Sequence, residues 1–484
     1  MILLLPWVPL AGALLGLFIS SKNEKLLKTI ALTATAIPFF ITLSFLWRFN
    51  AGAAGFQFVQ THAWLPTLGI QYRLGLDGIN MTLCLLHALV SFAGALVACA
   101  PKQRLKEYLF YFLILVGGIY GVFTSLDLFF LYLFFEMTLI PLFPMIGIWG
   151  SKNKEYGAMK LTLFITTGAV LAFFGLLLLY REAGLQSFDL IALTDALHHH
   201  SLALDFQRLA APLILIGFGV IASLWPLHSW SPIGYAAAPT TVSMLHAGVL
   251  KKMGPYLILR VAVALMPEGV RTCAPWLSVL AGIGIVYAGL AAIRQRDLKY
   301  MVGFSSVSHM GYIMLGIAAM NPVSLAGVVL LMFSHGVMAA CAFAVIGYLY
   351  ERTHVRTLND FGGLARQLPF LSICFIMAAM ASLGLPGFSN FVSELLVFIG
   401  SWTQFPLIVA FAILGVLITA IYLLRAVKEV CYGKPNPRWA ALKDPAGFTE
   451  RFPFILLLSA LLLFGIWPNG LLRIIEPAVG ALLK

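Results

Sequence analysis

The chain has 484 residues, of which 61% are hydrophobic and only 10% are charged, and its formal net charge is +12. A soluble domain carries roughly 25% charged residues, so this composition excludes a soluble protein and predicts an integral membrane protein. In a chain with many spans, a net positive charge indicates cytoplasmic loops rich in Lys and Arg, and no nucleic-acid partner is expected.

The apolar runs are continuous and do not alternate, which favours helices over a transmembrane barrel. Because about 20 apolar residues cross a bilayer as a helix, we expect an all-α polytopic protein with about fourteen transmembrane helices. The expected spans lie near residues 2–20, 28–47, 79–100, 107–125, 126–148, 157–180, 208–225, 240–262, 274–293, 300–320, 323–350, 369–403, 405–427 and 452–471.

The charges of the loops support this number of spans. If the first loop is on the inside, every second loop after it is also inside. These inner loops together hold twenty Lys and Arg residues, including Lys102, whereas the outer loops hold seven. Loops rich in Lys and Arg stay on the cytoplasmic side. The pattern therefore predicts that both termini lie outside.

Two of the expected spans are interrupted in a similar way, one in ASLWPLHSWSP from Ala222 and the other in ASLGLPGFSNF from Ala381. Proline removes a backbone donor and breaks a helix, so we expect breaks at Pro226 and at Pro386 with Gly387. Irregular backbone at membrane depth must be surrounded by protein or line a water-filled cavity. Paired broken helices in inverted repeats are typical of ion and solute carriers.

An odd number of spans separates the two breaks, so the repeats would have opposite orientations. We expect two five-helix repeats, roughly helices 4–8 and 9–13, with helices 7 and 12 broken. The expected domains are helices 1–3 in residues 1–100, the first repeat in 107–262, the second repeat in 274–427, and helix 14 with a tail in 452–484.

Five ionisable residues of different spans fall near the middle of the membrane or beside a break. An ionisable group there costs roughly 2.5 kcal/mol or more, so it is a functional candidate. A row of such groups at one depth suggests a path for protons or ions along the membrane. A structural alternative exists for each, such as an ion pair or a histidine bonded to a carbonyl. The five are Glu136, Lys252, His309, His335 and Glu394.

Four further residues are candidates for accessory positions. Lys251 adjoins Lys252, and His228 and His246 lie near the first break. Lys160 lies three residues into its span and can extend to the cytoplasmic interface. A run of three histidines at 198–200 resembles a metal tract, but no Cys or carboxylate spacing supports it, so no metal site is expected.

Several motifs, taken together, resemble the antiporter-like membrane subunits of respiratory complex I, the proton-pumping NADH:quinone oxidoreductase. They are LGLDGIN, SLDLFFLYLFFEMTLIP, PLHSW, HAGVLKKMGPYLILR, QRDLKYMVGFSSVSHMGY, FSHGVMAACAF, YERTHVRTLNDFGGL and LGLPGFSNFVSE, spread over nearly the whole chain. Within the family, the glutamate of SNFVSE favours the group of subunit M and mitochondrial chain 4 over its sister subunits.

The resemblance implies a role for each of the five residues. Glu136 would be the glutamate of the fifth span, which pairs with a lysine of the seventh, and Lys252 would be the central lysine of the eighth. His309 and His335 would continue the proton path to Glu394, the terminal group on the twelfth span. The chain would hold no cofactor, since flavin, iron–sulfur clusters and quinone belong to partner subunits. Its partners would be the other membrane-arm subunits and the lipid of a bacterial inner membrane, with both termini periplasmic.

The sequence departs from the family pattern at two positions. The seventh-span lysine is expected seven residues before His228, where Ile221 stands, and a second histidine of the family motif is replaced by Tyr235. Three explanations remain open: Lys251 is a relocated partner of Glu136, Glu136 is neutral and unpaired, or the chain belongs to a variant complex with altered or lost pumping.

Two other functions compete with a complex I subunit. An Mrp-type cation/proton antiporter subunit would share the same architecture. A haem or quinone redox enzyme would need facing axial histidines, and the four histidines of the spans show no such pairing.

Overall fold

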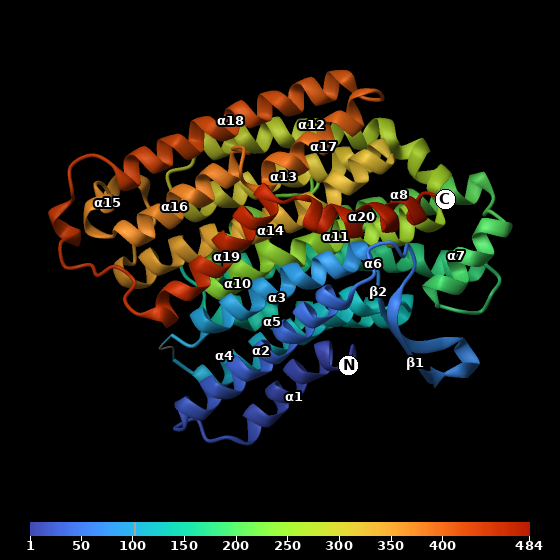
Figure 1. The fold of residues 1–484 in the computed structure, drawn as a ribbon, viewed down its shortest axis with the longest axis horizontal. Helices are drawn as coiled ribbons and strands as arrows, with labels where there is room; N and C mark the ends of the chain where they lie inside the picture. Colours follow the sequence, from blue (N-terminus) through green and yellow to red (C-terminus); the bar gives the residue numbers. More distant parts are fainter. Residues whose placement is uncertain (101–102) are drawn as a thin grey trace.

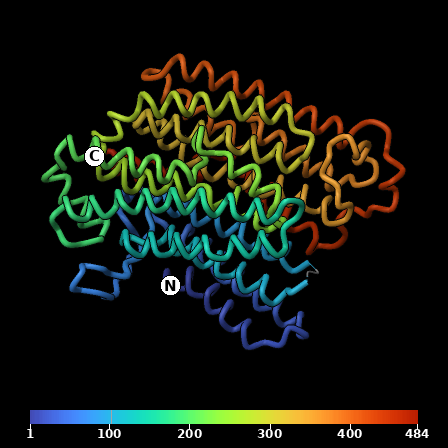
Figure 2. Tube along the Cα trace, turned by 180° about the vertical axis from the view of Figure 1, so that it is seen from behind, coloured from blue at the N-terminus to red at the C-terminus, as the bar shows by residue number. Residues whose placement is uncertain are grey.

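The computed structural model describes residues 1–100 and 103–484; Lys102 of the charged loops lies outside the described residues. Long helices run along the longest axis of the molecule and form one bundle (Figures 1 and 2). The hairpin of residues 57–76 and helix α7 lie at one end, and α15 and the loop of residues 432–447 lie at the other.

The N-terminal part contains three long helices and a hairpin. In chain order these elements are α1 (Leu4–Phe18), α2 (Glu24–Arg48), β1 (Gln57–Leu65), the short helix η1 (Pro66–Leu68), β2 (Ile70–Leu76) and α3 (Gly78–Ala98). The central part follows with α4 (Leu105–Thr124), α5 (Leu128–Trp149), α6 (Lys154–Glu182), α7 (Leu190–His199), α8 (Leu204–Ile221), α9 (Trp230–Ala237), α10 (Thr240–Leu245), the π-helix η2 (His246–Leu250), α11 (Lys251–Leu257) and the π-helix η3 (Ile258–Val263).

The C-terminal part holds the remaining elements. They are α12 (Pro267–Arg294), α13 (Leu298–Ala319), α14 (Pro322–Thr353), η4 (Leu358–Asp360), α15 (Leu364–Gln367), α16 (Pro369–Ser382), α17 (Ser389–Trp402), α18 (Pro406–Cys431), η5 (Pro437–Trp439), α19 (Phe448–Ile466) and α20 (Asn469–Leu482).

The predicted all-α membrane architecture is confirmed, and each expected span falls on one helix or on consecutive helical segments. Among the described residues, eleven helices are long and apolar enough to cross a membrane. The other three expected spans are the 15-residue α1, the composite α10–η3 and the split pair α16–α17. That all fourteen cross the bilayer remains a prediction.

Two segments differ from the all-helical expectation. Residues 57–76 form an antiparallel two-stranded sheet, in which Thr61 pairs with Arg73 and His62 with Tyr72. The predicted C-terminal tail is largely the helix α20, whose residues Ile474 and Ile475 are buried against the bundle. Gly78 lets α3 begin there, because a Cβ at this position would lie 1.6 Å from the carbonyl oxygen of Ile474.

The backbone is interrupted in the same way at both predicted breaks. After α8 ends, Ser223 has a φ of 60°, and after α16 ends, Gly384 has a φ of 72°. The next residue in each case donates its N–H five residues back, Leu224 to Gly219 and Leu385 to Met380. This shared pattern supports the repeat arrangement that the sequence predicts.

A second pair of matching features lies at opposite ends of the bundle. Asp127 caps the start of α5 and Asp297 caps the start of α13, and each side chain accepts from the N–H groups two and three residues later. Isolated bridges connect Asp127 to Asp189 near α7, and Asp297 to Thr357 near α15. Because α7 and α15 lie at opposite ends (Figure 1), the two matching helix starts point in opposite directions.

The eighth expected span contains two π-helical turns around the adjacent lysines. In η2 the N–H of Lys251 donates to His246, five residues earlier. π turns occur mostly as short insertions in α-helices and are frequent at functional sites. At the far end of this span, Arg260 forms a buried ion pair with Asp77, the residue that caps α3.

Two glycines bring α14 against the π turn. A Cβ at Gly336 would lie 2.5 Å from the carbonyl oxygen of Gly248, and one at Gly248 would lie 3.1 Å from the carbonyl oxygen of Gly336. The two backbones therefore touch where His335 precedes Gly336. Small residues allow such close approach between membrane helices, and this contact places His335 beside the lysine-bearing helix.

We predict that Asp77→Ala destabilises the protein by about 3–5 kcal/mol, because it leaves the Arg260 guanidinium buried without its partner. The measurement is thermal unfolding in detergent, compared with the parent chain. The double variant Asp77→Ala/Arg260→Leu removes both charges and should be less destabilised than the single variant. An Asp77→Ala protein that unfolds with the parent would contradict this role of the ion pair.

We also predict that Gly336→Val destabilises the protein by about 1–3 kcal/mol, because overpacking forces the helices apart. Gly147→Ala in α5 is the matched control, since nothing lies within 4 Å of its added Cβ. Alanine is favoured over glycine in a helix by up to about 1 kcal/mol, so the control should unfold no earlier than the parent. If the Gly336→Val variant unfolded at the same temperature as the parent, the close approach of the Gly336 and Gly248 backbones would not be needed for stability.

Candidate functional site

Four of the five predicted relay residues form one buried cluster on α11, α13, α14 and α17. Lys252 and His335 have no exposed surface, His309 is 1% exposed and Glu394 is 4% exposed. The rings of His309 and His335 lie 4.9 Å apart between centroids. The cluster thus gathers titratable groups from four helices that are distant in the sequence.

His309 lies at the centre of the cluster. Its Nδ1 is 2.8 Å from the carbonyl oxygen of Ser305, and its Nε2 is 2.9 Å from that of Ser382. Carbonyl oxygens only accept hydrogen bonds, and a neutral imidazole has one N–H. Both contacts are therefore hydrogen bonds only when His309 is doubly protonated, so the site is shaped to accept a proton.

The second break supplies one of these acceptors. Ser382 is the last residue of α16, and the carbonyls at a helix end have no partner within the helix. His309 Nε2 is also 3.6 Å from Oε1 of Glu394. That distance suits an ion pair and is too long for a hydrogen bond, so a proton on His309 would be stabilised by the carboxylate.

The carboxylate of Glu394 faces the broken segment. A Cβ at Gly384 would lie 2.9 Å from Oε2 of Glu394, and its φ of 72° also favours glycine there. Oε1 of Glu394, Oγ of Ser389 and both side-chain polar atoms of Asn390 are buried without hydrogen-bond partners. Buried polar groups of this kind are normally satisfied by internal water, which indicates a hydrated region beside the break.

His335 connects the lysine to this region. Both of its ring nitrogens are buried and lack hydrogen-bond partners. Lys252 is close enough to interact electrostatically with both His335 and His309. Lys252, His335, His309 and Glu394 therefore lie in one group of buried side chains that interact electrostatically or by ring contact.

Lys252 is held by the backbone of its own span. Its ammonium group donates to the carbonyl oxygen of Ala247, five residues earlier, within the π turn. The wider turn directs this carbonyl to the side chain. A buried ammonium group needs such oxygen acceptors, because an unpaired charge is strongly disfavoured in an apolar interior.

Lys251 points to a different part of the molecule. Its Nζ lies 3.1 Å from Oγ of Ser231 on α9 and 3.3 Å from Oγ of Ser306 on α13, and it lies 5.5 Å from the ring centroid of Tyr235. The predicted ion pair with Glu136 is not formed, and among the described residues no ion pair includes Glu136. The idea of a relocated partner is therefore wrong, because α11 directs Lys251 toward α9 and α13 instead.

Glu136 lies apart from the cluster, on α5. It is partly buried and lies one turn from Tyr132, with which it interacts. Its neighbours along the helix face, Leu133 and Ile140, are 45% and 67% exposed. Ionisable residues in membrane spans usually face the bundle interior or pair with another group, so the position of Glu136 beside exposed apolar side chains is unusual.

The accessory candidates have separate surroundings. Lys160 is partly buried and lies over the rings of Tyr156 and Phe164 on its own helix, 5.7 and 5.9 Å from their centroids. His228 follows the first break and packs against Tyr287, with Nδ1 unpartnered. Neither set of contacts tests the accessory roles predicted for Lys160 and His228, which remain predictions.

His246 is placed with the Lys251 group. Its Nδ1 lies 3.4 Å from the hydroxyl of Tyr235, and its Nε2 is buried without a partner. The ring also packs edge-on against Trp230. The structure therefore contains a second group of ionisable side chains near the first break.

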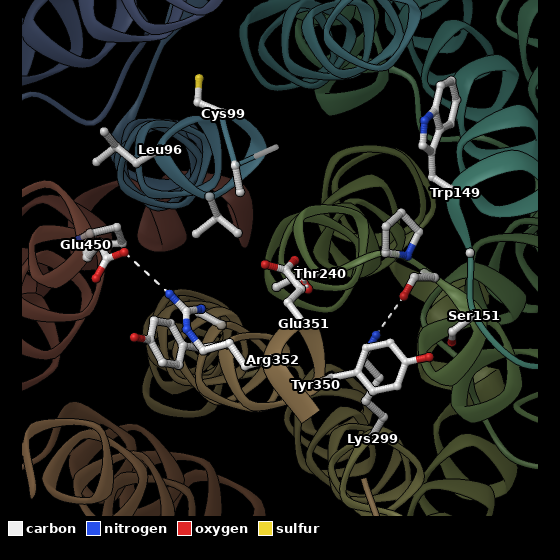
Figure 3. A pocket seen from close by; sticks show the side chains of 18 of the residues that line it. Leu96, Cys99, Trp149, Ser151, Thr240, Lys299, Tyr350, Glu351, Arg352 and Glu450 are labelled. Carbon is white, nitrogen blue, oxygen red and sulfur yellow. Dashed lines mark hydrogen bonds and ion pairs between the residues drawn. The ribbon is translucent and has the colours of Figure 1, made fainter. Parts of the chain in front are cut away.

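A large pocket opens at the end of the bundle that holds the Lys- and Arg-rich loops. It has a volume of about 1000 Å³ and is lined by the ends of α3, α5, α14 and the starts of α10 and α19. Figure 3 shows Thr240, Glu351 and Lys299 around its inner part, with Arg352 directed at Glu450. Thr240 donates to Glu351, so the first residue of α10 lies at the pocket wall.

Several buried polar residues of the bundle were absent from the sequence-based set. His87 on α3 is fully buried, with Nε2 2.9 Å from the carbonyl oxygen of Val116 and Nδ1 unpartnered. Tyr422 on α18 donates to Ser305 beside His309. A single histidine or tyrosine in an apolar run has no spacing signal, so only packing could identify these contacts.

The histidine run at 198–200 ends α7 and is exposed. Within the described part of the chain, no group of three or more His, Cys, Asp or Glu residues is arranged to hold a metal ion.

Residues 125–419 match a family profile described as the NADH:quinone oxidoreductase/Mrp antiporter transmembrane family. The chain is 34% identical over 489 residues to the NADH-quinone oxidoreductase subunit M of Rickettsia conorii, which covers 99% of this chain and 97% of that protein.

Two solved structures extend the comparison. A chain of respiratory complex I from Thermus thermophilus with bound NADH is 27% identical and matches with a TM-score of 0.89, covering 100% of both chains. A chain of the Mrp complex from Dietzia sp. DQ12-45-1b matches with a TM-score of 0.86 at 19% identity, covering 100% of this chain and 97% of that one. The second likeness concerns the fold alone.

Proposed function

The chain belongs to the NADH:quinone oxidoreductase/Mrp antiporter transmembrane family, and from this premise we propose that it is a proton-translocating, antiporter-like subunit in the membrane arm of a complex I-type NADH:quinone oxidoreductase. It acts as part of a translocase whose flavin, iron–sulfur clusters and quinone are held by partner subunits. Its partners are other membrane-arm subunits, especially sister antiporter-like subunits.

The buried cluster of Lys252, His335, His309 and Glu394 is the observation that carries this proposal. Proton transfer between side chains needs titratable groups within hydrogen-bond reach or joined by water. The ring contact between His309 and His335, the two carbonyls that face His309 and the buried unpartnered polar atoms around Glu394 support such transfer with water between the groups. Quinone reduction elsewhere would shift the protonation of the cluster.

The proposed arrangement in the membrane follows the loop charges. The protein spans a bacterial inner membrane with both termini on the periplasmic side, and the Lys- and Arg-rich loops face the cytoplasm. The matching breaks and the oppositely directed starts of α5 and α13 support two inverted repeats in residues 107–262 and 274–427. The cytoplasmic end is then the end with the large pocket.

A complex I-type subunit is favoured over an Mrp-type antiporter. The Rickettsia relative that carries the subunit M name is similar over nearly the full length of both chains. The Mrp structure shares the fold at 19% identity. A chain that exchanged cations for protons without the other membrane-arm subunits would favour the Mrp function instead.

The absence of a lysine at position 221 bears on how this subunit pumps. Ile221 is buried at the end of α8, and Lys251 does not pair with Glu136. Two of the three explanations then remain: Glu136 is neutral and unpaired, or the chain belongs to a variant complex with altered or lost pumping.

We predict that Lys252→Met and Glu394→Gln each lower the number of protons moved per quinone reduced by the intact complex. Each substitution removes a group that holds or passes a proton and keeps a similar side-chain volume. The measurement is proton uptake by inside-out membrane vesicles, normalised to quinone reduction.

The control variants are Lys25→Met and Glu476→Gln, which neutralise exposed residues outside the cluster. Both controls should pump as the parent does, with equal amounts of assembled complex. Parental pumping in both Lys252→Met and Glu394→Gln would rule out proton translocation through this cluster.

A further inference from the structure

The group of side chains around Lys251 is distinct from the cluster used so far. In an α-helix, residues five apart point about 140° away from each other. The π turn instead joins His246 and Lys251 by a backbone hydrogen bond over five residues. It therefore stacks them on one side of the span, which an uninterrupted α-helix would not do.

Lys251 is fully buried and its side-chain partners are two hydroxyl groups, those of Ser231 and Ser306. No carboxylate pairs with it among the described residues. A hydroxyl can accept from an ammonium group and can donate to a neutral amine. Its surroundings thus suit both protonation states, whereas a paired carboxylate would hold it charged.

Lys251 also lies at the first break. One turn later, a Cβ at Gly254 would lie 2.6 Å from the carbonyl oxygen of Phe218 and 2.8 Å from the N of Ala222. The end of α8, which includes Ile221, therefore packs directly against the helix that carries Lys251. Ser231, one of its two partners, lies on α9 just beyond the break.

The backbone segment that carries Lys251 begins at the wall of the large pocket. Thr240 lines the pocket and begins α10, and His246 follows six residues later, a rise of about 9 Å. The buried hydroxyl of Ser243 lies between them on the same segment. Nε2 of His246 is buried and unpartnered while Nδ1 faces the hydroxyl of Tyr235, and such an unpartnered atom is normally satisfied by water.

A route also leads onward from Lys251. Its second partner, Ser306, lies on α13 three residues before His309, so both residues share one face of that helix. Lys252 interacts electrostatically with His335, whose ring lies 4.9 Å from that of His309 between centroids. His309 therefore lies near neighbours of both lysines.

We propose that Lys251 is a second proton-carrying ammonium group. It receives a proton from the large pocket through His246 and Tyr235, and it passes a proton through Ser306 to His309. The transfer turns the Lys251 ammonium into a neutral amine and His309 into an imidazolium that donates to Ser305 and Ser382. His246 then returns a proton to the amine. This branch rests on the proposed function, since it delivers protons to the cluster described there.

The test compares Lys251→Met and Lys251→Arg in the intact complex, using inside-out vesicles. Arginine keeps the charge and donors but does not release a proton in proteins. Each variant removes an ammonium group that can release a proton, so both variants should lower the number of protons taken up per quinone reduced. Parental pumping in the Lys251→Arg variant would overturn the proposal, because charge alone would then suffice.

Lys252→Met, measured beside them, separates this inference from the proposed function. If Lys252→Met loses pumping and both Lys251 variants keep it, the branch is wrong and the main path stands. If all three variants pump as the parent does, the proposed function falls as well. Where the Lys251 variants fail to assemble, His246→Gln and Ser306→Ala decide, and parental pumping in both overturns the branch.

A rescue variant tests the location of the group. Ile221 ends α8 beside the Lys251 helix, so Ile221→Lys in the Lys251→Met background would return an ammonium group to the same junction. We expect recovery of at least part of the lost proton uptake. Loss of pumping in Lys251→Met with no recovery in the double variant would overturn the claim that an ammonium group at this junction carries the proton.

Discussion

An ammonium group inside a membrane protein must be surrounded by oxygen atoms, and this requirement governs the centre of the molecule. Lys251 and Lys252 are adjacent and have no exposed surface. Regular α-helices use almost all of their carbonyls internally, so they offer few acceptors at membrane depth. Acceptors are present here where the helices depart from regular geometry or carry serine.

Three departures from regular helix supply most of the polar contacts. The π turn directs the Ala247 carbonyl to Lys252, and the second break frees the Ser382 carbonyl for His309. The first break leads into α9, which contributes Ser231 to Lys251. Such irregular backbone carries a conformational penalty that persists where the surrounding structure stabilises it. The surrounding helices provide that support through backbone contacts at glycine, as between Gly248 and Gly336.

The two halves of the chain share a backbone plan but differ in their side chains. Both breaks have the same hydrogen-bond pattern, yet the second faces Glu394 and unpartnered polar atoms, whereas the first faces Lys251 with hydroxyl and aromatic neighbours. Ile221 and Tyr235, where the sequence resemblance implies a lysine and a histidine, lie around this first break.

The sequence by itself determined the membrane class, the helix ranges, the two breaks and the four residues of the main cluster. Hydropathy and loop charge act locally, and a titratable residue in an apolar run is visible without knowledge of its neighbours. The family motifs added the expected order of the relay. Local alternation in residues 57–76 and the amphipathic C-terminal segment were overlooked, since both lie outside the long apolar runs.

Only the tertiary structure decided which groups meet. The Ala-Ser-Leu matches that begin at residues 222 and 381 would align Ser223 with Ser382. The backbone angles and hydrogen bonds instead align Ser223 with Gly384. The missing lysine at position 221 suggested Lys251 as a partner for Glu136, whereas packing places Lys251 beside Ser231 and Ser306. A π turn shifts every following side chain around the helix axis, so the direction of a lysine depends on long-range packing that residue spacing does not encode.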